Sequence, residues 1–174
     1  IDAAVTAIGM LHKQHVQVKL WILGKKNQEY VETKLKPICR QYGIYWGEGE
    51  KECDKDIVSW GFVSEEKKLE LLSRATALLF PSIREGWGIP ITEAGVVGTP
   101  SIVYNSPGIR DAVNGGKAGY LCQSNDVDGL VAMMNQVIKD TVQYNEVKQR
   151  AYDFSKEFRW EKAGKVLEKF LDEK

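Results

Sequence analysis

Short continuous apolar runs alternate along this chain with longer stretches in which apolar residues recur every three or four positions. The continuous runs predict buried strands at 16–24, 57–60, 75–82, 100–104 and 118–122. The periodic stretches predict helices at 2–15, 27–42, 64–75, 126–139, 141–155 and 160–172, with one more ending near Gly98 and a short one after Ser106. Strands that alternate with helices indicate a mostly parallel sheet with helices on both faces, so we expect a three-layer α/β fold.

Local features refine this outline. The sequence shows about five strands, one fewer than a doubly wound sheet of six, and no repeat or flexible linker, so we expect one domain over residues 1–174 with five to six strands. Pro37 lies inside a predicted helix and predicts a kink or a break there. The stretch 43–56 is polar, acidic and rich in glycine, which predicts a loop. Ser64 is a typical N-cap for the helix that follows it.

Composition narrows the functional classes. The 174 residues include 24 Lys and Arg against 24 Asp and Glu, so the formal net charge is zero. A nucleic-acid binder that relies on bulk charge would carry a basic excess. Cys39, Cys53 and Cys122 stand far apart without a CxxC pair, which excludes a disulfide scaffold or a cysteine zinc site and indicates a reducing compartment. No apolar run approaches the length of a membrane span.

A histidine pair and a cysteine could in principle bind a ligand, but we expect neither to form a site. His12 and His15 are three residues apart on the first predicted helix, a spacing that can hold zinc when a third ligand is near. The sequence offers no such ligand, so we expect solvated histidines. Cys122 ends a predicted strand, and we expect it to be a small buried apolar side chain.

The turn after the strand at 75–82 is the first candidate for chemistry, because ligands of open parallel sheets collect at the carboxyl ends of the strands. Gly86 and Gly88 flank Trp87, so the backbone between them can approach a ligand closely. Pro90 suits the first turn of the following helix, where its missing amide costs nothing. The N–H groups of Gly88 and Ile89 would then point out of a helix N-terminus, where a phosphate binds readily.

Two carboxylates accompany this turn: Glu85 in the loop and Glu93 about one helical turn into the helix. A carboxylate repels phosphate but accepts hydrogen bonds from sugar hydroxyls, including both hydroxyls of a ribose diol. Phosphate-binding amides beside such carboxylates describe a site for a sugar nucleotide. Each residue also has a plainer explanation: Glu93 can complement the helix dipole, Glu85 can be a solvated loop residue, and Trp87 can pack rather than stack.

The chain resembles the nucleotide-sugar-binding half of retaining glycosyltransferases in three segments: PSIREGWGIPITEA, GTPSIV and GIRDAVNGGKAGYL. More narrowly, it resembles family 4, whose members have two facing Rossmann-like domains, the GT-B fold. The usual pattern there is PS, a few residues, EGFG, EA and then G-x-P, and Trp87 stands where Phe is commonest. The resemblance extends from DAAVTAIGML to FRWEKAGKVLEKFL, where Arg159 replaces the common Ser. It implies that residues 1–174 form one Rossmann-like donor-binding domain.

The resemblance implies a role for each residue of the candidate site. Glu85 would be the catalytic residue that contacts the hydroxyls of the donor sugar, and Glu93 would bind the ribose hydroxyls. Sugar hydroxyls and the diphosphate would be held by the backbone of Gly86, Trp87, Gly88 and Ile89. The base pocket would be lined by Gly61, Phe62 and Val63. The family uses no essential metal or cofactor, because basic side chains and helix dipoles stabilise the leaving diphosphate.

The resemblance also implies what the intact enzyme does. It would transfer a sugar from a nucleoside-diphosphate sugar to an acceptor with retention of anomeric configuration. Its location would be cytoplasmic, either in free solution or at the cytoplasmic face of a membrane. Two alternatives stay open: a sugar-nucleotide epimerase of the same fold, and a non-catalytic nucleotide-binding module.

In family members, an acceptor-binding N-terminal domain comes first, followed by a strand, a glycine-rich turn and an Arg and a Lys that neutralise the diphosphate. This chain begins at a helix that resembles the one after those parts. We therefore expect a domain fragment that lacks the first strand and is inactive alone. Its partners would be the nucleotide-sugar donor and the absent N-terminal domain, with no nucleic acid.

Overall fold

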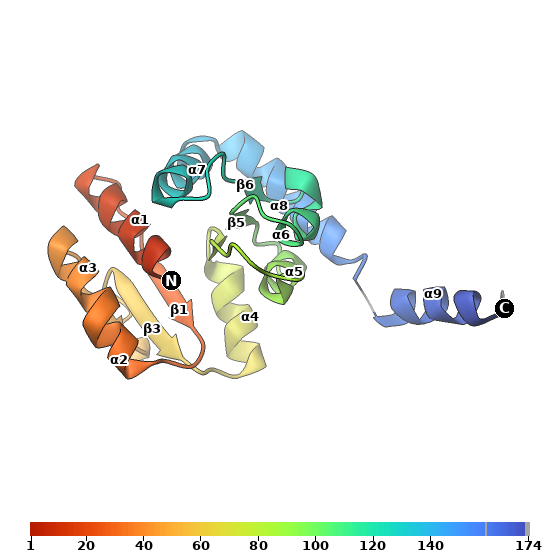
Figure 1. Cartoon of the computed structure of the whole chain (residues 1–174), viewed down its shortest axis with the longest axis horizontal. Helices are drawn as coiled ribbons and strands as arrows, with labels where there is room; N and C mark the ends of the chain where they lie inside the picture. The colour runs from red at the N-terminus through yellow and green to blue at the C-terminus, as the bar shows by residue number, and fades with distance from the viewer. Residues whose placement is uncertain (159, 173–174) are drawn as a thin grey trace.

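The computed structural model describes residues 1–158 and 160–172, and Figure 1 shows how their helices and strands are arranged. In this part of the chain the strands are β1 (Leu20–Leu23), β2 (Trp46–Glu48), β3 (Ile57–Gly61), β4 (Leu78–Phe80), β5 (Ser101–Val103) and β6 (Tyr120–Leu121). The longer helices are α1 (Asp2–Lys13), α4 (Glu65–Arg74), α5 (Ile89–Val96), α7 (Val127–Lys139), α8 (Thr141–Ser155) and α9 (Trp160–Asp172). Shorter helical segments are α2 (Gln28–Tyr30), η1 (Val31–Leu35), α3 (Lys36–Tyr42), η2 (Glu50–Glu52), α6 (Ile109–Ala112) and η3 (Asn114–Gly116). The predicted alternation of strands and helices is confirmed; Arg159 lies outside the described residues.

Local sequence explains where these helices begin and where one of them changes geometry. The Ser64 hydroxyl accepts a hydrogen bond from the Lys67 N–H and caps α4, as predicted. Near Pro37 the predicted helix is irregular, because the turn before it, η1, is a π-helix. There the N–H of Lys36 bonds to the carbonyl of Val31, five residues back. The chain thus stays helical through Pro37 by changing its hydrogen-bonding pattern.

The loop predicted at 43–56 is wrong in one part. Trp46–Glu48 form β2, which pairs in parallel with β3 and places Trp46 beside Ile57. β2 has β3 as its one neighbour in the sheet, and an edge strand needs no continuous apolar run. The acidic, glycine-containing sequence of β2 therefore did not predict a strand, because β2 takes its conformation from its pairing with β3.

The strands form two parallel sheets of three, in the orders β1-β3-β2 and β4-β5-β6. Leu20 pairs with Ile57 in the first sheet, and Leu78 pairs with Ser101 in the second. The α/β class and the parallel pairing are confirmed. The expectation of one continuous sheet needs correction, because β1 and β4 make no hydrogen-bonded ladder with each other.

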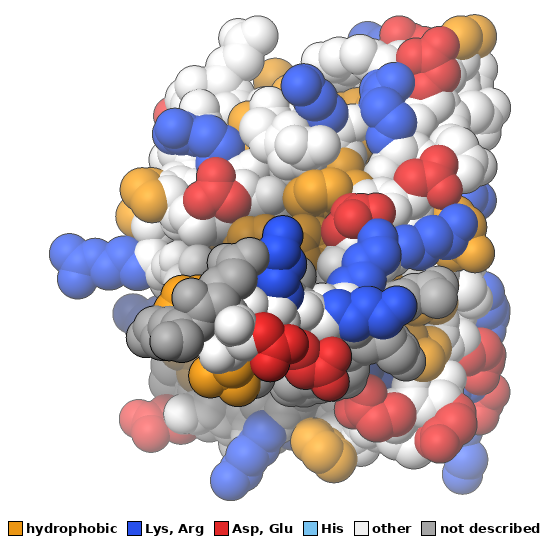
Figure 2. Space-filling model, turned by 90° about the vertical axis from the view of Figure 1, so that its right-hand side faces the viewer, with side chains coloured by type: hydrophobic (Ala, Val, Ile, Leu, Met, Phe, Trp, Pro, Cys, Tyr) orange, Lys and Arg blue, Asp and Glu red, His pale blue; other side chains and the backbone are white. Residues whose placement is uncertain are grey.

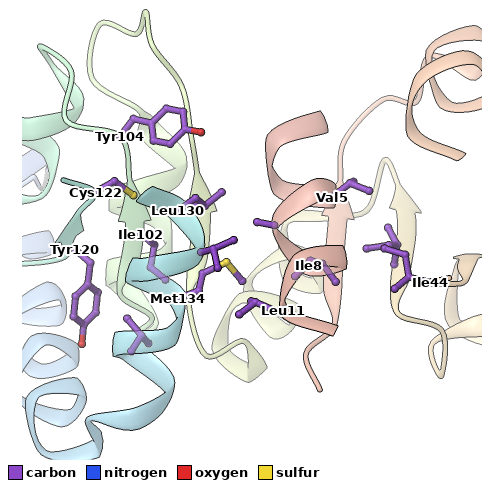
Figure 3. Packing of buried hydrophobic residues seen from close by; sticks show 14 of the residues in the cluster. Val5, Ile8, Leu11, Ile44, Ile102, Tyr104, Tyr120, Cys122, Leu130 and Met134 are labelled. Carbon is purple, nitrogen blue, oxygen red and sulfur yellow. The ribbon is translucent and has the colours of Figure 1, made fainter. Parts of the chain in front are cut away.

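Helices cover both faces of the strands. Adjacent residues of a strand point to opposite faces, and on β5 Ile102 packs with the cluster that contains α1 and α7, whereas Val103 packs with Ile91 of α5. On the first face α1 packs against α7, and Figure 3 shows Leu11 of α1 beside Met134 of α7. This contact joins the two sheets into one core.

An apolar slot separates the two sheets. All residues of β1 and of β4 are only half-buried, although those of β5 are fully buried. Between β1 and β4 lies a cavity of about 390 Å³, whose lining includes Trp21, Leu79, Leu71 of α4 and Met134 of α7. The half-burial of β1 and β4 therefore has a local cause: each strand has an unpaired edge that faces this slot.

Candidate functional site

The loop from β4 to α5 has the predicted helix N-terminus at its end. Gly88 is the residue before α5 and has a φ of 83°, which is strained for any other residue type. A Cβ at Gly88 would also lie 2.9 Å from Cδ1 of Ile91, so the end of that side chain would have to shift, but the requirement for glycine comes from the backbone conformation. Pro90 lies in the first turn, as predicted. The N–H of Ile91 bonds back to the carbonyl of Gly88, while the described residues offer no acceptor to the N–H of Ile89.

The loop after β5 supports the loop that carries Glu85. Gly108 has a φ of 77°, and a Cβ there would overlap the carbonyl oxygen of Gly86 and lie 2.6 Å from that of Glu85. Nearby, the buried hydroxyl of Ser106 donates to the carbonyl of Ser82 at 3.1 Å. These two contacts fix one loop against the other. Neither Ser106 nor Gly108 was among the predicted site residues. The signal in the sequence was a glycine, Gly108, in the loop after the strand next to β4.

Glu85 itself has an exposed side chain, and the described residues provide it with no hydrogen-bonding partner. A Cβ at Gly86 would meet nothing within 4 Å, so space is open above this backbone. The side chains of Ile83 and Ile89 are exposed on either side of it. The loop thus presents a free carboxylate and open backbone between apolar side chains, which suits a ligand with hydroxyl groups.

Trp87 is turned toward the protein. Its indole Nε1–H donates to the hydroxyl of Thr92 at 3.0 Å, and its ring meets the edge of Phe158 with centroids 4.8 Å apart. The side chain also packs against the cluster that contains Ile91. The indole thus packs within the protein, which agrees with the simpler of the two interpretations of Trp87.

Glu93 lies on α5 and is held by a lysine of α4. The Lys68 ammonium donates to Oε1 of Glu93 at 2.8 Å and also lies 2.7 Å from Oε2 of Glu65. Hydrogen bonds to Glu65 and then to Glu93 raise the pKa of Lys68 above its usual value, so it is a cation at neutral pH. Dipole complementarity alone does not describe Glu93, because a specific cation fixes one of its oxygens.

Gly61, Phe62 and Val63 form the link between β3 and α4. The carbonyl of Gly61 accepts a hydrogen bond from the N–H of Gly24 at 2.8 Å, which fixes the end of β3 against the end of β1. Phe62 is 89% exposed, which is unusual for a large apolar side chain in a folded domain. Because α4 follows directly and carries Lys68, this exposed segment and Glu93 belong to adjoining elements.

The other candidate groups have structural roles. His12 is not solvated as expected: its side chain is 13% exposed and its Nε2 bonds to the carbonyl of Val18 at 2.8 Å, whereas His15 is exposed. Among the described residues no three potential ligands gather around a metal position. The three cysteines are free, and Cys122 is buried as expected; its burial raises the pKa of the thiol to about 11.

The face of the molecule in Figure 2 carries both signs of charge, in keeping with the balanced charge of the sequence. Figure 2 shows Lys and Arg interspersed with Asp and Glu on the face it presents, with apolar side chains between them. Within the described ranges, no helix has both the length and the apolar character that crossing a lipid bilayer requires.

Comparison with known proteins places this geometry in a family. The family model for glycosyl transferases group 1 matches residues 47–154. A glycogen synthase of Mycobacterium tuberculosis is 38% identical over 80 residues, which are 46% of this chain and 19% of that protein. The O-antigen chain mannosyltransferase B of Escherichia coli is 33% identical over 101 residues, 58% of this chain and 26% of that protein. The chain thus spans only 19% and 26% of the length of these two curated relatives.

A solved structure gives the same result for the fold. The Anabaena protein HepE, in complex with UDP, superimposes with a TM-score of 0.79 and 17% identity over 99% of this chain and 44% of that one. At this identity the likeness concerns the fold alone. The family model, in contrast, covers more than half of the chain and includes the Glu85 loop, α4 and α5. The chain therefore belongs to the glycosyl transferases group 1 family.

Proposed function

We propose that this chain is the donor-binding half of a retaining glycosyltransferase, which binds a nucleoside-diphosphate sugar at the loop before α5. The observation that carries the proposal is the combination at one loop and helix of an unpartnered carboxylate, Glu85, the free N–H of Ile89 at a helix N-terminus, and the carboxylate of Glu93. HepE, which shares the fold, was crystallised with UDP and with UDP-glucose.

The residues divide the donor between them. The N-terminus of α5 and the backbone from Gly86 to Ile89 bind the diphosphate, and the helix dipole stabilises its growing negative charge as the sugar leaves. Glu85 accepts hydrogen bonds from hydroxyls of the sugar and holds it in its reactive orientation. Glu93 binds the ribose, and the segment from Gly61 to Val63 borders the base. The proposal involves no essential metal, no other cofactor and no nucleic acid.

The proposal also includes a partner segment, a strand that enters the slot between β1 and β4. The unpaired edges of these strands face one cavity with an apolar lining, which is the environment of a buried parallel strand. The C-terminal end of α1 leads into the start of β1, and Asp2 lies at the other end of this helix. A strand that runs parallel to β1 in the slot and then leads into α1 would therefore leave the slot beside Asp2. The acceptor-binding half of the enzyme would precede that strand.

Nucleotide binding by the intact polypeptide that contains these residues tests the donor site. Titration calorimetry with UDP, GDP and ADP should detect binding of at least one of them. Glu93→Ala should weaken that binding roughly tenfold or more, since a hydrogen bond to a charged group is worth about 1.5–3 kcal/mol. Glu70→Ala, on the exposed side of α4, is the matched control and should bind normally. Unchanged affinity in Glu93→Ala would show that the ribose assignment is wrong.

Turnover tests the chemistry. Glu85→Ala should lower kcat by a larger factor than it weakens nucleotide binding, because the nucleotide itself does not contact Glu85. An equal loss of both would make Glu85 a general binding residue. NMR of the product should show the anomeric configuration of the donor. Conversion of the donor to an epimer without any acceptor would instead identify the epimerase alternative.

A further inference from the structure

Lys68 connects the two elements that the proposed donor would touch. It lies one turn into α4, directly after the segment from Gly61 to Val63, and its ammonium reaches Glu93 on α5. Lys68 and Glu93 are 23% and 30% exposed, so the ion pair is neither fully solvated nor sealed inside the core. A pair in this position is accessible to a ligand and is partly protected from screening by solvent.

The hydrogen-bonding capacity of the pair is not exhausted. Among the described residues, Oε1 of Glu93 is engaged by Lys68, while Oε2 has no partner. An ammonium has three N–H groups, and those of Lys68 have two partners here, Glu93 and Glu65. One acceptor and one donor therefore remain side by side. The chemical group that matches such a pair is a vicinal diol, because one hydroxyl can donate to the carboxylate while the other accepts from the ammonium.

We propose that Lys68 is a second ribose-binding residue, which together with Glu93 recognises the 2′,3′-diol of the donor nucleotide. This inference rests on the proposed donor-binding function. Lys68 has two effects: it holds the Glu93 carboxylate in one orientation, and it donates its remaining N–H to a ribose hydroxyl. The site consequently distinguishes ribose from deoxyribose, because a 2′-deoxy sugar leaves one member of the half-buried pair without its partner.

The adjacent lysine provides the matched control. Lys67 has the same charge on the same helix, and its ammonium bonds to Glu70 at 3.0 Å, away from α5. Lys67→Met therefore removes one positive charge near the nucleotide and leaves the contact with Glu93 intact. Glu65→Gln is a second variant, since it removes the negative charge of the other partner of Lys68 and keeps the pair with Glu93.

The experiment measures, in the intact polypeptide, the affinity for the preferred nucleoside diphosphate and for its 2′-deoxy analogue. The unaltered protein should bind the ribonucleotide roughly ten- to a hundredfold more tightly, the scale of one hydrogen bond to a charged group. Lys68→Met should bring this ratio close to one, whereas Lys67→Met and Glu65→Gln should retain it. Circular dichroism of each variant confirms that it is folded.

Four outcomes overturn the inference. If Lys68→Met weakens both nucleotides equally and keeps the ratio, Lys68 serves the diphosphate or the fold and not the diol. If Lys67→Met lowers the ratio as much, the effect is one of general charge. If the unaltered protein binds no nucleotide at all, the proposed function fails and this inference fails with it. Loss of the ratio in Glu93→Gln, together with its retention in Lys68→Met, would leave the proposed function standing and refute the inference alone.

Discussion

Gly108→Ala is the sharpest test of how the site is supported, because Gly108 belongs to a loop outside the proposed ligand contacts. Its φ of 77° costs an alanine about 1–2 kcal/mol. The new Cβ would also overlap the carbonyl oxygen of Gly86 and lie 2.6 Å from that of Glu85, and relieving such an overlap typically costs about 1–3 kcal/mol. We therefore expect the free energy of unfolding to fall by about 2–5 kcal/mol in total, measured by urea denaturation with tryptophan fluorescence.

The relief of this overlap has a functional consequence. The neighbouring backbone must move away from Gly108, and a displacement of about 1 Å at a catalytic group can lower the rate roughly a hundredfold. We expect kcat of the intact enzyme to fall on that scale, with a smaller loss of nucleotide affinity.

Gly115→Ala separates the two costs. Gly115 has a φ of 63°, but a Cβ there would meet nothing within 4 Å, so this variant carries only the conformational cost. It should lose about 1–2 kcal/mol of stability and keep its transferase activity. If Gly108→Ala were no less stable and no less active than Gly115→Ala, the proposed contact between the two loops would not determine the position of Glu85.

Three further predictions concern other parts of the chain. Trp87→Phe removes the hydrogen bond to Thr92 and should lower the unfolding free energy by about 0.5–1.5 kcal/mol in urea denaturation; a tenfold loss of donor affinity instead would show that the indole contacts the ligand. Because burial raises the pKa of Cys122 to about 11, iodoacetamide at pH 8 should label the exposed Cys53 long before Cys122 in the folded protein, read by mass spectrometry, and early labelling of Cys122 would contradict its burial. A hydrogen bond from the N–H of Gly129 lowers the pKa of Asp126, so the contribution of Asp126 to stability is present above the pKa of the unfolded state and is lost as the pH falls through the folded pKa. The loss of unfolding free energy in Asp126→Ala should therefore become smaller in acid. A loss that does not depend on pH would show that this hydrogen bond is not the cause.

Much of the fold follows from local sequence, because helices and buried strands carry their own periodicity. The apolar stripe of α1 and the continuous run at β5 were visible for this reason. The missed strand, β2, is held by its pairing with β3 and has no apolar run of its own. The division into two sheets could not be predicted from the local sequence either. The sequences of β1 and β4 have the pattern of buried strands, and this pattern does not show whether another strand pairs with each of their edges.

The candidate site divides in the same way. Glu85, Gly88 and Pro90 lie in one short segment, and their spacing predicted a loop that enters a helix. The contact between Lys68 and Glu93 spans 25 residues, and that of Gly108 with the Glu85 loop joins two different strands' loops. Neither contact can be predicted from the sequence near these residues, since each depends on how separate elements pack.

The division into two sheets also determines how this domain can assemble. Residues 20–61 supply all of the first sheet and residues 78–121 all of the second, so each sheet is contiguous in sequence and can form largely from local contacts. The sheets share no backbone hydrogen bonds in the described chain and are joined by the packing of α1 against α7. The two halves are coupled through the packing of side chains in one shared core, and we expect them to differ in the protection that hydrogen exchange measures. A strand bonded to both β1 and β4 would merge them into a single cooperative unit.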